Sequence, residues 1–278
     1  MRDILTIARL TWQEARRRKI FWAALVLGIA FIALYTVAFY FTIRDMPEVL
    51  RGQEIMLESG LAFVVVAAYY VISFLGVMLA VLTSVGTLSG EVSSHTIQCL
   101  AVKPFPRHVL VLGKWLGLAA MLIVYIVFLC AGVAAGTWAI ARFVPEHLVK
   151  GVALICLQAV IMLTLSLWGG TRLSTVANGV VAFMLYGVAF IGGWLEQIGL
   201  ALSNQTVINI GIISSLLVPS EAMWKMAAYD MQPALINSLY VSPFSSSSPP
   251  SMAMLIYALL YTAFLVWAAV CSFSRRDL

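Results

Sequence analysis

Charged residues are scarce in this sequence. Asp, Glu, Lys and Arg make up 10% of its 278 residues, and hydrophobic residues make up 62%. Soluble domains contain about 25% charged and about 45–50% apolar residues. The composition therefore excludes an ordinary soluble protein and indicates a chain whose solvent is largely lipid.

Motifs that bind nucleotides or catalyse hydrolysis are also missing. The Gly113-Lys114 pair is followed by Trp115, so it does not complete a phosphate-binding loop. The metalloprotease motif His-Glu-x-x-His and the hydrolase motif Gly-x-Ser-x-Gly do not occur. We therefore predict that the chain is not an enzyme, does not hydrolyse ATP by itself and needs no cofactor.

Metal-binding patterns are incomplete. His95 and Cys99 lie four residues apart, but two ligands do not make a site. The five methionines between residues 223 and 254 are interpreted as packing residues rather than Cu(I) ligands. The four cysteines form no Cys-x-x-Cys pair, so neither a metal site nor a disulfide framework is predicted.

Long hydrophobic runs are abundant. A bilayer core about 30 Å thick needs roughly 20 apolar residues in a helix. Six stretches meet this demand, at residues 20–43, 61–87, 109–140, 151–170, 176–195 and 252–273. The sequence therefore predicts an all-α membrane protein with six transmembrane helices. The third stretch exceeds one bilayer, so its first turns around Lys114 are expected to tilt or project into the cytoplasm.

The positive charges predict the orientation. With the N-terminus inside, 12 of the 17 Lys and Arg residues fall in cytoplasmic segments and 5 fall outside. Cytoplasmic loops of membrane proteins carry this excess. Both termini are therefore predicted in the cytoplasm, and the basic character of the chain points to lipid rather than nucleic acid as its partner.

The predicted span interiors contain no charged side chain. Lys114 and Arg172 lie near cytoplasmic ends and Glu196 near an outer end, where long side chains are expected to reach the interface. Ion-coupled transporters usually keep ionisable groups inside their spans. If the protein transports, its energy is expected to come from elsewhere.

Residues 1–19 are predicted to form an amphipathic helix at the membrane interface. Its apolar face combines six residues: Ile4, Ile7, Ala8, Thr11, Trp12 and Ala15. Arg2, Arg9, Gln13 and Arg16 lie on the opposite face, an arrangement typical of interfacial helices.

Residues 196–251 are predicted to be an outer region before the last span. The apolar run 207–218 is too short to span and is interpreted as re-entrant or interfacial. A seventh span is the alternative, but it would place the C-terminal arginines outside. Ser220 is expected to cap a helix after Pro219, and residues 244–250 read as a linker, both outside the membrane.

Pairs of glycines four residues apart occur at Gly86/Gly90, Gly113/Gly117 and Gly132/Gly136. In lipid, such pairs let helix backbones approach closely. The pattern is common in membrane spans, so it does not by itself identify a dimer face.

The segment 88–108, between the second and third spans, is the most informative loop. A short helix is expected there, with Ile97 and Leu100 on one side and Pro104 ending it. An apolar knob with charges around it suits docking into a groove on a soluble partner.

This loop also carries a family resemblance. Its pattern is Glu91, Thr96-Ile97, Leu100, Lys103-Pro104, Arg107 and then Gly113-Lys114. The pattern, with the basic N-terminal helix and six spans, resembles the permease subunit of ABC-2 type transporters over the whole chain. His95 stands where many members have Gly. The chain is most similar to a bacterial subset that includes the permease of the copper-site maturation system for nitrous oxide reductase.

The resemblance implies a single permease domain, residues 1–278, in a bacterial inner membrane. Two copies would pair with two separate ATP-binding subunits to form an exporter or a mechanotransmitter. The coupling contacts implied by the resemblance are Glu91, Thr96, Ile97, Leu100, Lys103 and Arg107. The outer region leaves room for a periplasmic partner, and no nucleic acid is expected.

Two alternatives stay open at this point. A channel or secondary transporter would work without an ATPase, but neither buried ionisable residues nor inverted repeats are apparent in the sequence. A membrane anchor or assembly factor would share all the features above.

Overall fold

The computed structural model describes residues 2–45, 54–87, 107–233 and 250–274. Within these ranges the regular structure is helical. The helices are α1 (Arg2–Arg17), α2 (Lys19–Arg44), α4 (Glu54–Ser84), α7 (Arg107–Ala141), α8 (Leu148–Gly170), α9 (Thr175–Ala201), α10 (Gln205–Leu217), α11 (Ser220–Met231) and α13 (Met252–Ser274). This confirms the predicted all-α fold.

The six predicted spans are all present. The helices α2, α4, α7, α8, α9 and α13 are long and apolar enough to cross a membrane, so the chain is a multi-pass membrane protein. Most helix ends agree with the sequence prediction to within about three residues. Two ends differ: α4 begins at Glu54 instead of 61, and α9 runs on to Ala201 instead of ending at 195. Helix α7 has 35 residues, which corresponds to about 52 Å.

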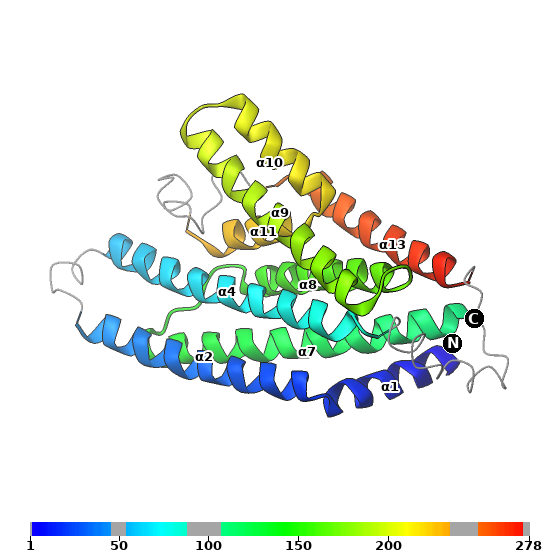
Figure 1. Cartoon of the computed structure of the whole chain (residues 1–278). Helices are drawn as coiled ribbons and strands as arrows, with labels where there is room; N and C mark the ends of the chain where they lie inside the picture. The colour runs from blue at the N-terminus through cyan, green and yellow to red at the C-terminus, as the bar shows by residue number, and fades with distance from the viewer. Residues whose placement is uncertain (1, 46–53, 88–106, 234–249, 275–278) are drawn as a thin grey trace.

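The helices are arranged in three layers (Figure 1). The helices α1, α2 and α7 form the lower layer in this view, and α4 and α8 form the middle one. The helices α9, α10, α11 and α13 lie above them. Helix α8 is the centre of the fold, since it contacts α4, α7, α9, α11 and α13.

The first and last helices point to the same end of the bundle (Figure 1). The chain enters through α1 at this end and leaves through α13 at the same end. An even number of crossings produces this arrangement, in agreement with six spans.

Helix α1 has the predicted amphipathic face. Thr11 and Ala15 are buried, and Ile4, Ile7, Ala8 and Trp12 are half-buried, whereas the arginines of the helix are largely exposed. The face lies against the first half of α7 rather than being left for lipid. Two α7 glycines make this contact close: a Cβ on Gly113 would lie 2.6 Å from Ile7 Cβ, and one on Gly117 would lie 2.6 Å from the Ala8 carbonyl oxygen.

The second glycine pair of α7 faces another helix of the same chain. A Cβ on Gly132 would lie 2.6 Å from Ile32 Cδ1, and one on Gly136 would lie 2.8 Å from Thr36 Oγ1. Both Ile32 and Thr36 belong to α2. The two glycine pairs of α7 therefore serve contacts within the chain, where the absent side chains let helices approach.

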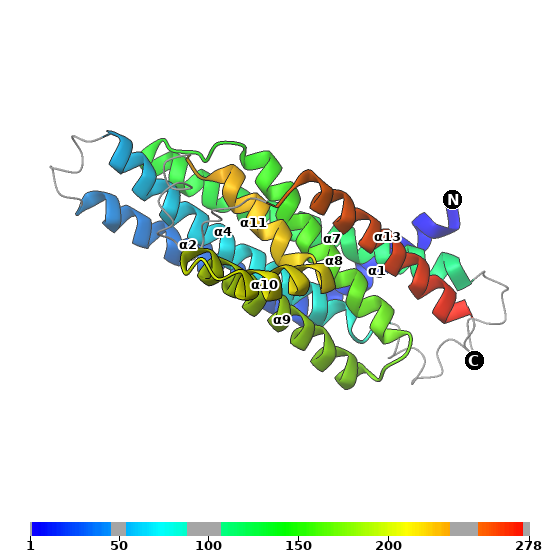
Figure 2. The ribbon, with the colours of Figure 1, turned by 90° about the horizontal axis from the view of Figure 1, so that it is seen from above.

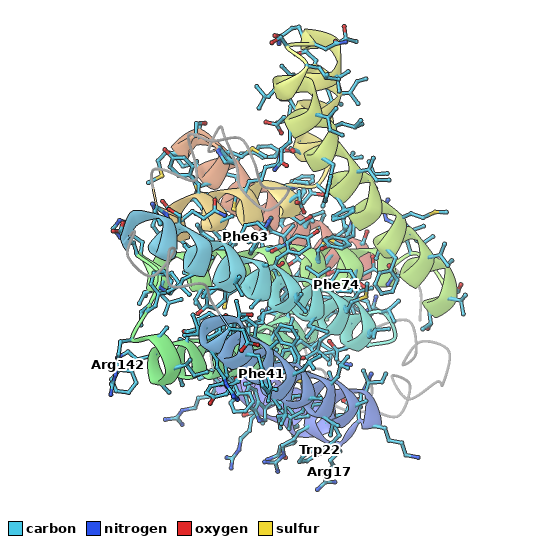
Figure 3. The ribbon with its side chains drawn as sticks, turned by 90° about the vertical axis from the view of Figure 1, so that its left-hand side faces the viewer. Arg17, Trp22, Phe41, Phe63, Phe74 and Arg142 are labelled. Atoms are coloured by element: carbon cyan, nitrogen blue, oxygen red, sulfur yellow. The ribbon has the colours of Figure 1, made fainter. Side chains whose placement is uncertain are left out.

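Helix α2 leaves most of its surface uncovered. Only 6% of its most apolar window is buried within the chain. Trp22 and Phe41 are about half exposed, and Figure 3 shows Trp22 pointing away from the bundle beside Arg17. A helix that is apolar on its open side requires lipid or another protein surface around it.

Helices α10 and α11 form a bent pair with an angle of 108° between them. Asn204 caps α10 by accepting a hydrogen bond from Thr206 N at 3.1 Å. Helix α10 then runs back along α9, because Ile208 lies near Gly199 and Ser214 near Gly192. Figures 1 and 2 show α9 and α10 side by side, next to α11.

Helix α11 returns toward the end from which α10 came. It begins with Glu221 beside Gly193 in α9, and it ends with Met231 against Gly151, close to the first residues of α8. The pair α10–α11 thus starts and ends toward the same end of the bundle, and we call it the re-entrant hairpin. This arrangement favours the interpretation of residues 207–218 as re-entrant over a seventh span.

Helix α11 packs into the helix bundle rather than lying exposed beside it. Its residues are almost all buried, and Met223, Trp224, Ala227 and Met231 belong to the main hydrophobic core. The prediction that Ser220 caps this helix is wrong, because Pro219 occupies the N-cap position and the Ser220 hydroxyl is buried without a partner among the described residues. Glu221, Lys225 and Asp230 gave this helix the charge content of an exposed one.

Candidate functional site

The residues on either side of the segment 88–106 form the candidate coupling site. Five of the six predicted coupling residues, Glu91, Thr96, Ile97, Leu100 and Lys103, lie outside the described residues, as do His95 and Cys99. The sixth, Arg107, is the first residue of α7. Its Nη1 donates a hydrogen bond of 3.0 Å to the carbonyl oxygen of Ser274, at the end of α13.

The other side of the segment is held by a lysine. Lys114 Nζ donates a hydrogen bond of 3.1 Å to the Thr87 carbonyl oxygen. Lys114 is 4% exposed, so its ammonium is buried against the chain rather than open to solvent. Its partner is a carbonyl oxygen just beyond the end of α4, where backbone carbonyls lack partners within the helix.

Asn178 in α9 fixes the same turn from a second direction. Its Nδ2 donates to the Ser166 carbonyl oxygen in α8 at 2.8 Å and to the Val85 carbonyl oxygen at 3.4 Å. Asn178 is buried, and Ser174 caps the first turn of α9 just before it. One amide therefore joins α8, α9 and the end of α4.

Three hydroxyl side chains near this end of α4 are satisfied by their own helix. Thr83, Ser84 and Thr87 each donate a hydrogen bond of 2.7 Å to the carbonyl oxygen four residues earlier. In a bilayer an unpaired hydroxyl costs free energy, and this pairing removes the cost. The polar turn can thus lie among apolar helices.

Helix α13 is joined to the same end of the bundle by a second arginine. Arg172, which follows α8, donates from Nε to Ser272 Oγ at 3.0 Å. We call the four pairs Arg107–Ser274, Lys114–Thr87, Asn178–Val85 and Arg172–Ser272 the anchor cluster. The cluster ties both sides of the segment 88–106 to α7, α8, α9 and α13.

Sequence reasoning missed Lys114 and Asn178 as members of this site. The available signal was their polarity, because a lysine or an asparagine inside an apolar stretch is a candidate functional residue by default. Their partners are backbone carbonyl oxygens, which a sequence pattern does not reveal.

A buried ion pair lies in the other half of the molecule. Lys225 Nζ in α11 is 2.6 Å from Glu196 Oε2 in α9, with side-chain exposures of 4% and 20%. Glu221, one turn before Lys225, is buried, and its Oε2 has no partner among the described residues. Ionisable side chains are therefore buried in α11, a helix that is not one of the six spans.

Four of the five methionines agree with their interpretation as packing residues. Met223, Met226 and Met231 are buried in the main core and Met254 packs against it, whereas Met252 is 63% exposed. Among the residues that the structure describes, no group of three or more His, Cys, Asp or Glu side chains is placed to hold a metal ion.

A comparison with curated proteins found no match to this chain. A comparison with protein families matched residues 5–278 to the model described as ABC-2 family transporter protein. The match covers nearly the whole chain, including all six spans, the re-entrant hairpin and the segment 88–106. The chain therefore belongs to the ABC-2 family of transporter membrane proteins.

Proposed function

We propose that this protein is the permease of an ATP-driven transporter whose ATP-binding subunit is a separate chain. Residues 91–107 form the docking element. Each permease chain is a single domain, and two copies work together in the complex. The complex lies in a bacterial inner membrane with both permease termini in the cytoplasm. It acts as an exporter or as a mechanotransmitter to a periplasmic partner.

The observation that carries this proposal is the anchor cluster. A docking element transmits force only if its two ends are fixed to the helices that must move. Lys114 holds the chain as it leaves α4, and Arg107 holds it as it enters α7. A displacement of the segment between them would therefore act on α4, α7 and α13 together.

The family match supports a separate ATPase. Residues 5–278 are accounted for by the membrane component, and permeases of this family are typically non-catalytic. The phosphate-binding motif is also missing from these 278 residues. The energy source therefore lies outside them.

The chemistry of the docking element supports a mixed interface. Ile97 and Leu100 supply an apolar knob, whose burial in a groove provides most of the affinity. Glu91, Lys103 and Arg107 supply charges around it, each contributing about 1 kcal/mol or less if exposed. Thr96 contributes a polar contact at the start of the knob.

The resemblance to the permease of the nitrous oxide reductase copper-maturation system extends the proposal. In that subset the mechanotransmitter role is the one we favour, with a periplasmic protein receiving the motion. The scarcity of charge in the six spans agrees with it, because a small charged cargo would need polar groups along its path.

Co-purification from membranes tests the coupling. A tagged native chain is compared with the double variant Ile97→Asp/Leu100→Asp. We expect the native chain to recover an ATP-binding subunit and the double variant to lose it, because two carboxylates in an apolar groove are strongly unfavourable.

The matched control is Val149→Asp, at an exposed position in the first turn of α8. It adds a carboxylate to the opposite end of the bundle and is expected to leave recovery unchanged. If no ATPase is recovered with the native chain, the proposed function fails and the channel and anchor alternatives gain support.

A further inference from the structure

A cavity of about 350 Å³ lies between the re-entrant hairpin and the start of the last span. Its lining is amphipathic. The charged members are Glu196 and Lys225, Ser215 and Ser251 add hydroxyls, and Ile212, Leu216 and Met254 form part of the apolar wall. A volume of this size accommodates a small ligand or the polar part of a larger one.

The cavity is built rather than incidental. Tyr257 in α13 donates a hydrogen bond of 2.6 Å to the Leu216 carbonyl oxygen in α10, which fixes the last span against the hairpin. The Lys225–Glu196 ion pair fixes α11 against α9. The four helices around the cavity are thus joined in two pairs by specific polar contacts.

The depth of the cavity matches the level of lipid headgroups. Pro250 and Ser251 immediately precede α13, whose 23 residues correspond to about 34 Å, one bilayer core. The start of this span therefore lies at the boundary between hydrocarbon and headgroups. Ile212 and Leu216 on α10 are partly exposed, so the apolar wall continues to the lipid-facing surface.

The charges in the cavity select the class of ligand. An anionic headgroup would be attracted by Lys225 but repelled by the Glu196 carboxylate. A purely cationic headgroup would be attracted by Glu196 but repelled by Lys225. A zwitterion with both an ammonium and a phosphate can satisfy both side chains. A primary ammonium donates hydrogen bonds to Glu196, whereas a quaternary ammonium has no N–H to donate.

We propose that this cavity binds a zwitterionic phospholipid of the phosphatidylethanolamine class. The phosphate lies at Lys225, the ammonium at Glu196, and the acyl chains leave over Ile212 and Leu216. The site is separate from Thr87 and Arg107, the residues that flank the coupling segment at the other end of the bundle. The proposal does not depend on the ATP-driven function.

The test measures lipid retained by the purified chain. The protein is equilibrated with micelles that contain equal amounts of phosphatidylethanolamine, phosphatidylcholine and phosphatidylglycerol, and bound lipid is counted by native mass spectrometry. We expect phosphatidylethanolamine to be retained about ten-fold over phosphatidylglycerol, the ratio expected from one additional charge-assisted hydrogen bond. Equal retention of the three lipids would overturn the proposal.

Two variants locate the site. Glu196→Gln/Lys225→Met removes both members of the ion pair together, and Leu216→Trp fills the cavity from an exposed position while keeping the ion pair. Both are expected to abolish the preference. The second variant keeps the test decisive if the first does not fold.

The matched control removes another ion pair. Lys150→Met/Asp230→Asn deletes the more exposed Lys150–Asp230 pair, which joins α8 to α11 but does not line the cavity. It is expected to keep the native preference. A preference that survives in both cavity variants would contradict the proposed site.

A competition experiment separates a lipid from a free zwitterion. Soluble phosphoethanolamine carries the same ammonium and phosphate without acyl chains. We expect it not to displace the lipid at millimolar concentration, because it gains nothing from the apolar wall. If it competes as well as the intact lipid, the site belongs to a soluble zwitterion and the lipid proposal is wrong.

Discussion

At the scale of single residues, the glycines of this chain divide into two kinds. Gly117 lies where α1 crosses α7, and a Cβ there would be 2.6 Å from a backbone oxygen that has little freedom to shift. Gly187 in α9 has no atom within 4 Å of the Cβ position. One glycine is therefore required by packing and the other is not.

This difference gives a paired prediction. Gly117→Ala is expected to lower the free energy of unfolding by about 1–3 kcal/mol, because the backbones of α1 and α7 must separate. Gly187→Ala is expected to leave it unchanged or raise it by about 0.5–1 kcal/mol, as alanine favours a helix. Thermal unfolding of the detergent-purified variants measures both. Equal losses would contradict the close α1–α7 contact.

The two ion pairs of α11 give a second prediction at this scale. Lys225→Met leaves the carboxylate of Glu196 largely buried and without its cation, and is expected to cost about 3 kcal/mol. Lys150→Met breaks the pair with Asp230, whose lysine is 50% exposed, and is expected to cost less than about 1 kcal/mol. Denaturant unfolding compares the free energies of unfolding of the two variants. A larger decrease for Lys150→Met would contradict the burial of the Lys225–Glu196 pair.

At the scale of elements, the re-entrant hairpin determines the topology of the second half of the chain. If α10 and α11 together made one crossing, residues 203 and 233 would lie on opposite sides of the membrane. Because α11 returns toward the start of α8, we expect them on the same side.

Cysteine labelling in a background without the four native cysteines tests this expectation. Ser203→Cys and Pro233→Cys are expected to react with a membrane-impermeant reagent added from the periplasmic side. Arg16→Cys in α1 is expected to react only after the membrane is opened, since it lies at the end with both termini. Reaction of residues 203 and 233 from opposite sides would instead establish a seventh crossing.

The elements that sequence reasoning predicted well are those governed by one strong signal. The length of apolar runs gave the six spans, and the spacing of Ile4, Ile7, Ala8, Thr11 and Ala15 gave the buried face of α1. This spacing could not identify the partner of that face, because α7 and lipid are both apolar. The glycines at 113 and 117 indicated that another helix packs closely there, but not which helix.

Helix α11 shows where the sequence signal fails. Glu221, Lys225 and Asp230 give it the charge content of a surface helix, yet buried residues lie on several of its sides. Its burial depends on Glu196 in another helix, which neutralises Lys225. A contact between residues 29 positions apart leaves no periodic pattern, so the candidate cavity could not be predicted either.

At the scale of the whole molecule, the anchor cluster connects the coupling segment to four helices. Lys114→Met removes the hydrogen bond to Thr87, at the start of the coupling segment, without changing any residue of the docking element 91–107. We expect the ATP-binding subunit still to co-purify. The rate of ATP hydrolysis that the permease stimulates in lipid is expected to fall about ten-fold.

Lys114→Arg provides the control, because a guanidinium can donate to the same carbonyl oxygen. It is expected to restore most of the stimulated rate. If Lys114→Met stimulates hydrolysis as well as the native chain, Thr87 does not transmit motion. Loss of co-purification would show that Lys114 shapes the docking element itself.

The unbroken length of α7 has a mechanical consequence. The helix starts at Arg107, directly after the coupling segment, and ends at Ala141 at the opposite end of the bundle. As a rod of about 52 Å, it converts a tilt of about 5° at its first residue into a displacement of about 4–5 Å at its last. A small rotation on one side of the membrane thus becomes, on the other side, a movement nearly as large as the pitch of one helical turn, about 5.4 Å.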